Sequence, residues 1–313
     1  MKLSIVTTMY CSTPYLQEFY DRIKAEAETV TDDYEIIFVN DGSPDNSLET
    51  AVSLYKIDPK VRVLDLSRNF GHHKAMMTGL AHARGKLVFL IDCDLEEDPD
   101  LLGLFYQKRI ELNCDVVYGV QKNRKGSWIE QITGEIYYWL LRKLSGINFP
   151  KNVITARLMT RRYVKSLLRH RERELTIAAL WHITGYEQFP IYITKYSKGK
   201  TTYNFFKKLS VFVNSIVSFS DRPLMIIFYT GLIISIISAF FIIDILIQKL
   251  VFNIGLVGWP SLIVSIWFVG GLIICFLGII GIYISKIFIE TKRRPYSIIR
   301  EIYQYPSFPN RHE

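Results

Sequence analysis

Short hydrophobic runs alternate with longer amphipathic stretches between Lys2 and Gly119. Amphipathic helical stretches cover residues 15–30 and 72–83. Such alternation predicts a doubly wound, Rossmann-like α/β domain with a mainly parallel sheet, and we place this domain at residues 1–203. The runs that predict strands are rich in β-branched residues and comprise Leu3–Val6, Glu35–Val39, Val61–Leu64, Lys86–Ile91 and Asp115–Tyr118.

Two much longer apolar runs follow Pro223, at about 224–247 and 261–289. Each exceeds the roughly 20 apolar residues that cross a bilayer core about 30 Å thick. We therefore predict a transmembrane hairpin over residues 223–290 and a basic tail over residues 291–313. Lysines and arginines flank the outer ends, whereas the connecting loop offers Lys249 alone. The positive-inside rule then places both termini in the cytoplasm.

Residues 204–222 join the two regions and carry apolar side chains at helical spacing. This pattern predicts an amphipathic helix lying on the membrane, with an ordinary domain helix as the alternative. The net charge is +8. Because much of the basic excess sits beside the membrane segments, anionic lipid is the simpler partner, and we expect no nucleic acid. The four cysteines show no zinc or disulfide spacing.

Polar residues cluster where the predicted strands end, which is where open parallel sheets bind ligands. Asp92 and Asp94 follow the fourth strand, and two carboxylates separated by one residue suit a divalent cation that bridges a diphosphate. This pattern alone is weak, because acidic loops are common. Asp41, at the end of the second strand, suits a base or ribose. Arg68 and the helix start after Gly71 suit phosphate.

Five ordered segments resemble the family 2 glycosyltransferases of GT-A fold: Ser4–Tyr10, Val39–Ser43, Leu66–Ala75, Ile91–Leu95 and Asp115–Val120. More narrowly, nearly the whole chain is similar to the polyprenyl-phosphate glycosyltransferases, of the bactoprenol glucosyltransferase and dolichol-phosphate mannose synthase types. The resemblance implies inverting transfer of a sugar from a UDP- or GDP-sugar to undecaprenyl or another polyprenyl phosphate. We expect a single sugar, with glucose from UDP-glucose as the first candidate. It implies a multi-pass protein of the bacterial inner membrane with a cytoplasmic catalytic domain, and Mg²⁺ or Mn²⁺ as cofactor.

The resemblance also implies roles for individual residues. Asp92 and Asp94 match the catalytic metal and diphosphate motif, with Glu96 on the metal side. The positions matching the nucleotide site are Thr7, Tyr10, Asp41, Arg68, Gly71 and Asp92. Arg124 and Arg157 match basic positions near the phosphates. Lys122 lies with Arg124 in a basic loop, and this charge leads us to expect it near the acceptor phosphate. Small residues along the second apolar run, together with the resemblance, favour a homo-oligomer.

Several positions depart from the family pattern. Cys11 and Ser12 replace an asparagine and a glutamate, Gln121 replaces an arginine, and Thr155 stands where many relatives carry an aspartate proposed as a base. A phosphomonoester has a second pKa of about 6, so the acceptor is already mostly dianionic and needs little activation. We therefore expect Asp92 and Asp94 to manage the leaving diphosphate through a cation.

Three alternatives remain at this stage. The first is transfer of another sugar, such as mannose or amino-arabinose, to polyprenyl phosphate. The second is a protein or glycolipid acceptor. The third is an inactive, membrane-tethered scaffold that kept the fold, an interpretation raised by Cys11, Gln121 and Thr155.

Overall fold

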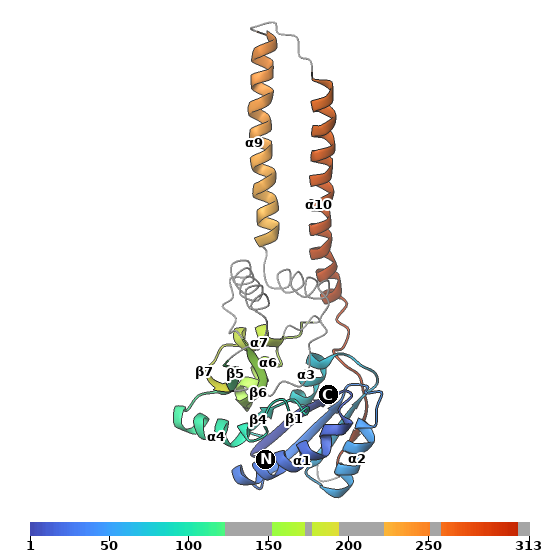
Figure 1. Ribbon diagram of the computed structural model, residues 1–313, viewed down its shortest axis with the longest axis vertical. Helices are drawn as coiled ribbons and strands as arrows, with labels where there is room; N and C mark the ends of the chain where they lie inside the picture. The colour runs from blue at the N-terminus through green and yellow to red at the C-terminus, as the bar shows by residue number, and fades with distance from the viewer. Residues whose placement is uncertain (123–151, 173–176, 194–221, 251–257, 306–313) are drawn as a thin grey trace. The chain divides into compact units, whose positions relative to one another are not determined.

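The computed structural model describes residues 1–122, 152–172, 177–193, 222–250 and 258–305 (Figure 1). The chain divides into two compact units. One holds an eight-stranded sheet with its covering helices, and the other holds the long helices α9 (Arg222–Leu250) and α10 (Trp259–Thr291). The amphipathic helix predicted at 204–222 lies outside the described residues, except that Arg222 begins α9.

The sheet has the strand order β7-β5-β6-β4-β1-β2-β3-β8. Its central strands β4, β1, β2 and β3 are parallel, whereas β6 and β8 run antiparallel to their neighbours β4 and β3. All five strands expected from the sequence are present as β1 to β5, and the prediction of a mainly parallel α/β sheet is confirmed. The strands are β1 (Leu3–Met9), β2 (Tyr34–Asn40), β3 (Val61–Leu66), β4 (Leu87–Leu90), β5 (Val116–Gln121), β6 (Val153–Thr160), β7 (Gln188–Ile193) and β8 (Ile299–Tyr303).

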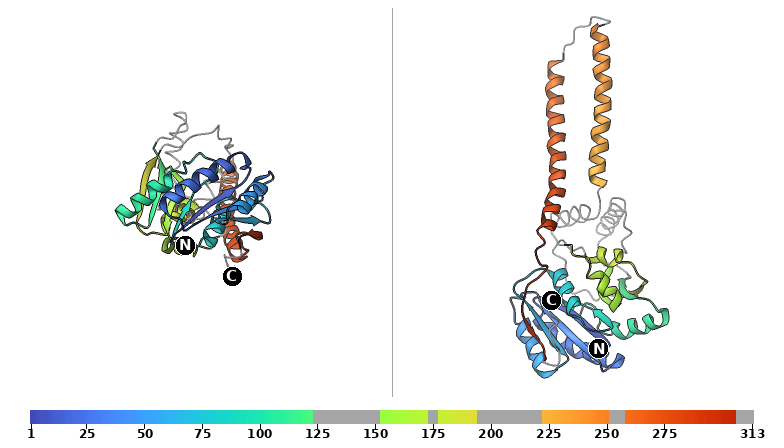
Figure 2. Two further views of the ribbon diagram at one scale, coloured as in Figure 1. Left: turned by 90° about the horizontal axis from the view of Figure 1, so that it is seen from below. Right: turned by 180° about the vertical axis from the view of Figure 1, so that it is seen from behind.

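Helices cover both faces of this sheet (Figures 1 and 2). One apolar core joins the sheet to α1, α2 and α4, and a second core on the opposite face joins it to α3, α6 and α7. All seven residues of both β1 and β2 are buried, because strands covered on both faces cannot alternate between core and solvent. The helices are α1 (Thr13–Val30), α2 (Ser47–Ile57), α3 (His72–His82), α4 (Leu101–Leu112), α6 (Arg161–Leu167) and α7 (Ile177–Ile183).

Part of the region expected to be a basic tail belongs to the sheet. Residues Ile299–Tyr303 form β8, which pairs with the edge strand β3. Arg300 forms an ion pair with the buried Asp65 at 2.6 Å between Nε and Oδ2. Residues Ile299–Tyr303 are therefore an integral edge of the α/β unit.

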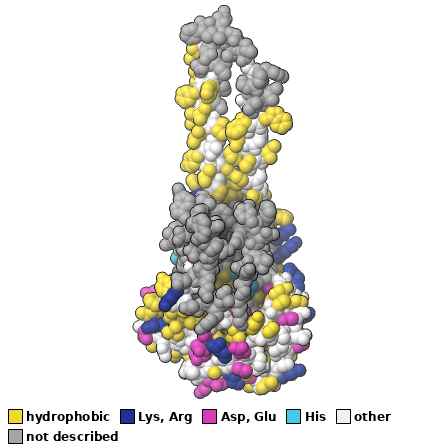
Figure 3. Space-filling model, viewed as in Figure 1, with side chains coloured by type: hydrophobic (Ala, Val, Ile, Leu, Met, Phe, Trp, Pro, Cys, Tyr) yellow, Lys and Arg dark blue, Asp and Glu magenta, His cyan; other side chains and the backbone are white. Residues whose placement is uncertain are grey.

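Within the described residues, one helix is long and apolar enough to cross a membrane by length and composition, Ser265–Thr291 of α10. Its 27 residues exceed the roughly 20 needed for a bilayer core. Hydrophobic side chains cover the described parts of α9 and α10 (Figure 3). In α9, Arg222–Ile234 passes only as a shorter apolar helix, so the second span at 224–247 stays a prediction.

Candidate active site

A cavity of about 380 Å³ opens beyond the carboxyl ends of β1, β2 and β4. This is the edge at which parallel sheets usually bind ligands. Four residues predicted from the sequence contribute to its wall, namely Tyr10, Asp41, Asp92 and Asp94. The remaining lining residues are Thr8, Met9, Ser12, Asn69, His72 and Cys93.

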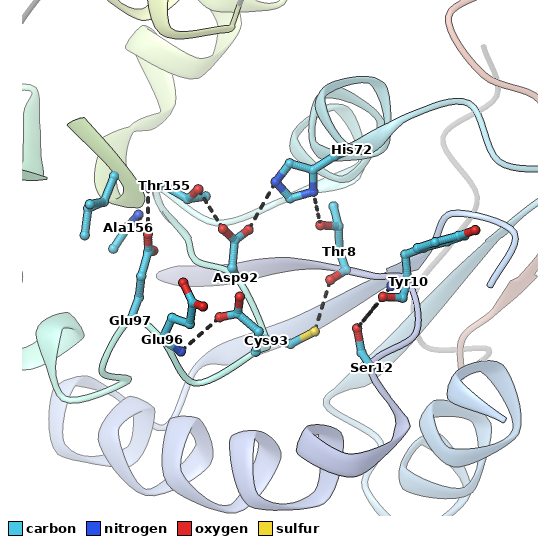
Figure 4. A network of polar contacts seen from close by, with 12 residues as sticks. Thr8, Tyr10, Ser12, His72, Asp92, Cys93, Glu96, Glu97, Thr155 and Ala156 are labelled. Carbon is cyan, nitrogen blue, oxygen red and sulfur yellow. Dashed lines mark hydrogen bonds and ion pairs between the residues drawn. The ribbon is translucent and has the colours of Figure 1, made fainter. Parts of the chain in front are cut away.

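The two carboxylate oxygens of Asp92, which lines this cavity, have different surroundings (Figure 4). Its Oδ2 accepts a hydrogen bond of 2.8 Å from Thr155 Oγ1. Its Oδ1 is buried and makes no hydrogen bond; Nε2 of His72 lies 3.4 Å away, beyond the usual hydrogen-bond range. A buried carboxylate oxygen without a partner costs about 1–3 kcal/mol or more. Such an oxygen is well suited to a ligand that brings positive charge.

His72, the first residue of α3, connects Asp92 to β1. Its Nδ1 lies 2.9 Å from Thr8 Oγ1, and its Nε2 faces Asp92. When the Thr8 hydroxyl donates to Nδ1, the ring hydrogen on Nε2 lies on the side of Asp92, but 3.4 Å is too far for an ordinary hydrogen bond to Oδ1. The His72 ring therefore lies beside one oxygen of Asp92, while Thr155 is hydrogen-bonded to the other.

The acidic loop after β4 is held by its own backbone and by β6. Asp94 Oδ1 accepts the N–H of Glu96 at 2.9 Å, and Leu95 between them adopts a left-handed conformation with φ of 60°. Glu97 is 1% exposed and accepts the N–H groups of Thr155 at 3.0 Å and of Ala156 at 2.8 Å. These bonds fix the loop before any ligand arrives, which is the preorganisation that electrostatic catalysis requires.

The residues present fit a divalent cation that a ligand helps to hold. The described part of the chain contains no group of three or more His, Cys, Asp or Glu residues arranged around a metal. Mg²⁺, however, is usually bound by one or two carboxylates, with water and substrate phosphates completing its octahedron. Asp92, with its open Oδ1, and Asp94 on the same loop supply such a partial set.

Asp41, which also lines the cavity, joins the loop after β2 to the loop after β3. Its carboxylate accepts the N–H groups of Phe70 at 2.7 Å and Gly71 at 3.0 Å. Burial raises the pKa of Asp41 above its ordinary value, and these two N–H groups act in the opposite direction. Gly42 has φ of +60°, and a Cβ there would lie 2.4 Å from the backbone nitrogen of Asn69. Glycine is therefore required for the two loops to approach this closely.

Other predicted residues lie outside the cavity wall. Thr7 is fully buried, with its Oγ1 lacking a partner, while its neighbour Thr8 faces the cavity. Arg68 is exposed, lies 4.1 Å from the Phe70 ring centroid and donates to the Asn69 carbonyl. Lys122 is not among the lining residues, and Arg124 falls outside the described residues.

Arg157, expected near a phosphate, is only 1% exposed. Its guanidinium donates to the carbonyls of Ile154 at 3.1 Å and Thr155 at 3.2 Å and packs on the Trp181 ring. Burial lowers the pKa of Arg157 to about 9. In this conformation the side chain supports the β6 segment that carries Thr155 and does not line the cavity.

Sequence reasoning missed Thr8, Asn69 and His72 as cavity residues. The alternation of side chains along a strand does not tell whether Thr7 or Thr8 faces the cavity, because this strand is buried on both faces. His72 is the first residue of α3, and its contact with Asp92 depends on the packing of α3 against the sheet.

Residues 4–170 match the family described as "Glycosyl transferase family 2". A relative named "Putative glycosyltransferases", from Mycobacterium tuberculosis, is 54% identical over 97% of this chain and 89% of that protein. A "Bactoprenol glucosyl transferase" of Shigella phage SfV is 32% identical over 96% of this chain and 98% of its own length. A "Prophage bactoprenol glucosyl transferase homolog" of Escherichia coli is 30% identical over 96% and 99%. The sheet is the mainly parallel α/β sheet of the GT-A fold, and the chain belongs to glycosyl transferase family 2.

Proposed function

We propose that this chain transfers a single sugar, glucose from UDP-glucose, to a polyprenyl phosphate with inversion at the sugar carbon. The observation that carries the proposal is the buried Oδ1 of Asp92, which makes no hydrogen bond and lies beside Asp94 in a cavity at the carboxyl edge of a family 2 sheet. The relatives named as bactoprenol glucosyl transferases support the lipid acceptor, because the similarity spans nearly their whole length.

The donor is proposed to lie across the two walls of the cavity. Tyr10 and Asp41 form the wall proposed for the nucleoside, and Asp92 with Asp94 form the wall proposed for the diphosphate. Mg²⁺ or Mn²⁺ held by Asp92 and Asp94 would neutralise the negative charge that builds up on the departing diphosphate. Thr155 holds the Asp92 carboxylate in the required orientation through its hydrogen bond to Oδ2, and the His72 ring lies beside Oδ1 at 3.4 Å.

The acceptor phosphate needs no protein base in this scheme. A phosphate oxygen attacks the sugar C1 as the bond between C1 and the diphosphate oxygen breaks, and the pair of electrons leaves with UDP. Since a phosphomonoester has a second pKa of about 6, the attacking oxygen carries no proton at neutral pH. Thr155 at the position of a proposed base is therefore compatible with activity, and its hydroxyl is used to hold Asp92.

Membrane attachment completes the proposal. The apolar helix Ser265–Thr291 would keep the enzyme in the membrane that contains its lipid acceptor, with the α/β unit in the bacterial cytoplasm. The second span, at 224–247, and a homo-oligomer remain part of the proposal.

The test is transfer of radiolabelled sugar by the full chain in detergent, with undecaprenyl phosphate as acceptor and a panel of UDP- and GDP-sugars. Butanol-extractable product is expected from UDP-glucose. Asp94→Asn should abolish it and leave the protein in the membrane fraction. Asp100→Asn is the matched control, because Asp100 lies in the same acidic run but pairs with Arg22 at 3.1 Å and is 64% exposed.

The outcomes separate the alternatives. If product forms from a GDP-sugar or an amino-sugar donor, that sugar takes the place of glucose in the proposal. If the label stays with protein, the acceptor is a protein and not a lipid. Absence of product with every donor would favour the inactive scaffold. Full activity of Asp94→Asn would contradict the role given to the acidic loop.

A further inference from the structure

A relay of polar side chains runs from the C-terminal strand β8 across two strands of the sheet. Arg300 Nε on β8 donates to Asp65 Oδ2 on β3 at 2.6 Å. The other oxygen, Oδ1, accepts from the Asn40 amide on β2 at 2.9 Å. Asn40 Oδ1 in turn accepts the N–H of Ser43 at 3.1 Å. Asp65 and Asn40 are 1% and 2% exposed, so water does not compete with these bonds.

The relay ends at the wall of the candidate active site. Ser43 Oγ accepts the N–H of Cys11 at 2.7 Å. Cys11 has φ of 53°, a left-handed conformation that a residue with a side chain keeps only when its surroundings enforce it. The two neighbours of Cys11 in the chain, Tyr10 and Ser12, both line the cavity. The geometry of this wall therefore depends on the position of Ser43.

A second set of contacts leads from the same C-terminal segment to the Asp41 loop. The carbonyl of Ile298 accepts the N–H of Ser67 at 2.9 Å, at the start of the loop whose far end donates to Asp41. Ser297 Oγ lies 2.6 Å from Thr78 Oγ1 on α3, the helix that begins with His72. Two independent routes thus connect β8 and its preceding residues to the proposed nucleoside wall.

β8 begins eight positions after α10 ends. As an edge strand it is held by β3 alone among the described strands, so its docking depends strongly on side-chain contacts such as Arg300–Asp65. If β8 leaves β3, the buried Asp65 loses its cationic partner and the bond that orients Asn40 is weakened.

We propose that β8 is a positioning strand for the donor site and that Arg300 is its key residue: docking of β8 on β3 sets the affinity of the cavity for the nucleotide. The inference rests on the proposed function, because it takes the cavity as the UDP-sugar site. Coupling between two binding events is reciprocal, so nucleotide binding must also strengthen the docking of β8. Donor affinity is then linked to the chain segment that follows the membrane helix.

The test measures UDP binding in the presence of Mn²⁺ by calorimetry, on the full chain in detergent. Arg300→Met should weaken UDP binding about 10-fold, within the usual range of coupling between sites. Arg300→Lys, which keeps a cation for Asp65, should recover part of the loss. Arg294→Met removes the same charge from the same segment, at a side chain that has no hydrogen bond or ion pair among the described residues, and should bind UDP like the wild type.

Two further readouts separate positioning from general loss of structure. In transfer assays Arg300→Met should raise the KM for donor and leave kcat at saturating donor close to that of the wild type. In the unsubstituted protein, UDP should slow hydrogen exchange of the amides in Ile299–Tyr303, a measurement that stands even if Arg300→Met does not fold.

The failures are distinguishable. If the wild type binds UDP, Arg300→Met binds it equally well, and exchange in β8 is unaffected by UDP, the inference is overturned and the proposed function stands. If the wild type does not bind UDP, both the proposed function and this inference are wrong.

Discussion

Asp65, on β3, and Asp92, just after β4, are two carboxylates of the same α/β unit with opposite hydrogen-bonding states. Asp65 is 2% exposed in its side chain, and both of its oxygens accept from a partner, Arg300 on one side and Asn40 on the other. Asp92 has one oxygen bonded to Thr155 and one buried oxygen without a donor. A fully bonded carboxylate holds structure together, whereas an open one costs stability and is retained where a ligand completes it.

Asp41 lies between these two cases. It is buried and bonded twice, to the N–H groups of Phe70 and Gly71, yet it borders the same cavity as Asp92. Its bonds fix the shape of the nucleoside wall. The cavity therefore combines one wall shaped by satisfied groups with one wall that keeps an unsatisfied charge.

The largest expected effect comes from Asp92→Asn, which removes the open charge. Transfer should fall about 10³-fold or more, because the cation and the leaving diphosphate lose a ligand. The melting temperature should stay the same or rise, since the substitution relieves an unsatisfied buried carboxylate. Asp65→Asn should do the reverse and lower the melting temperature. Thermal melts beside transfer assays check both, and equal destabilisation by the two substitutions would break the comparison.

Glu97→Gln tests the anchor of the acidic loop. The carboxylate accepts two backbone N–H groups of β6, and an amide can accept only on its oxygen side. We expect a loss of about 2 kcal/mol in unfolding free energy, in the range for hydrogen bonds to a charged group. Chemical denaturation measures it. Glu96→Gln, on the same loop, serves as the neighbouring control, and a loss as large in that variant would contradict the anchoring role of Glu97.

Thr155→Val removes the hydroxyl that holds Asp92 and keeps the shape of the side chain. A lost hydrogen bond to a carboxylate is worth about 1.5 kcal/mol, so kcat/KM should fall roughly 10-fold. Steady-state kinetics with varied donor give this value. Thr155→Ser keeps the hydroxyl and should retain most activity; an equal loss in both variants would show that the bond to Asp92 is not what matters.

The smallest expected effect is a change in how the melting temperature depends on pH, and it comes from the partly buried His82. Burial lowers the pKa of His82 below its ordinary value, although its ring bonds the Thr78 carbonyl at 2.9 Å. A base with a depressed folded-state pKa contributes stability above its unfolded pKa of about 6.5 and loses it as pH falls. The protein should therefore melt lower at pH 5.5 than at pH 7.5, and His82→Asn should flatten that difference. An unchanged pH slope in the variant would exclude His82 as its source.

The central sheet could be predicted because its strands are buried on both faces and appear as nearly continuous apolar runs. The position of Asp92 and Asp94 followed from the same signal, since the acidic residues come directly after the fourth run. The place of Asp41 followed in the same way from the end of the second run.

Contacts between distant segments could not be predicted. Thr155 reaches Asp92 across 63 positions, and Arg300 reaches Asp65 across 235. β8 has five residues, only partly buried, so it lacks the apolar run that marks the central strands. These contacts decide which carboxylates are satisfied, and local sequence patterns carry no information about them.

The most direct test of the central claim is calorimetric measurement of UDP binding with and without Mn²⁺, on the wild type and on Asp92→Asn. We predict that Mn²⁺ strengthens UDP binding to the wild type at least about 10-fold and gives no such gain in Asp92→Asn, because the open carboxylate oxygen is where the cation is held. An equal gain from Mn²⁺ in both proteins would contradict the account.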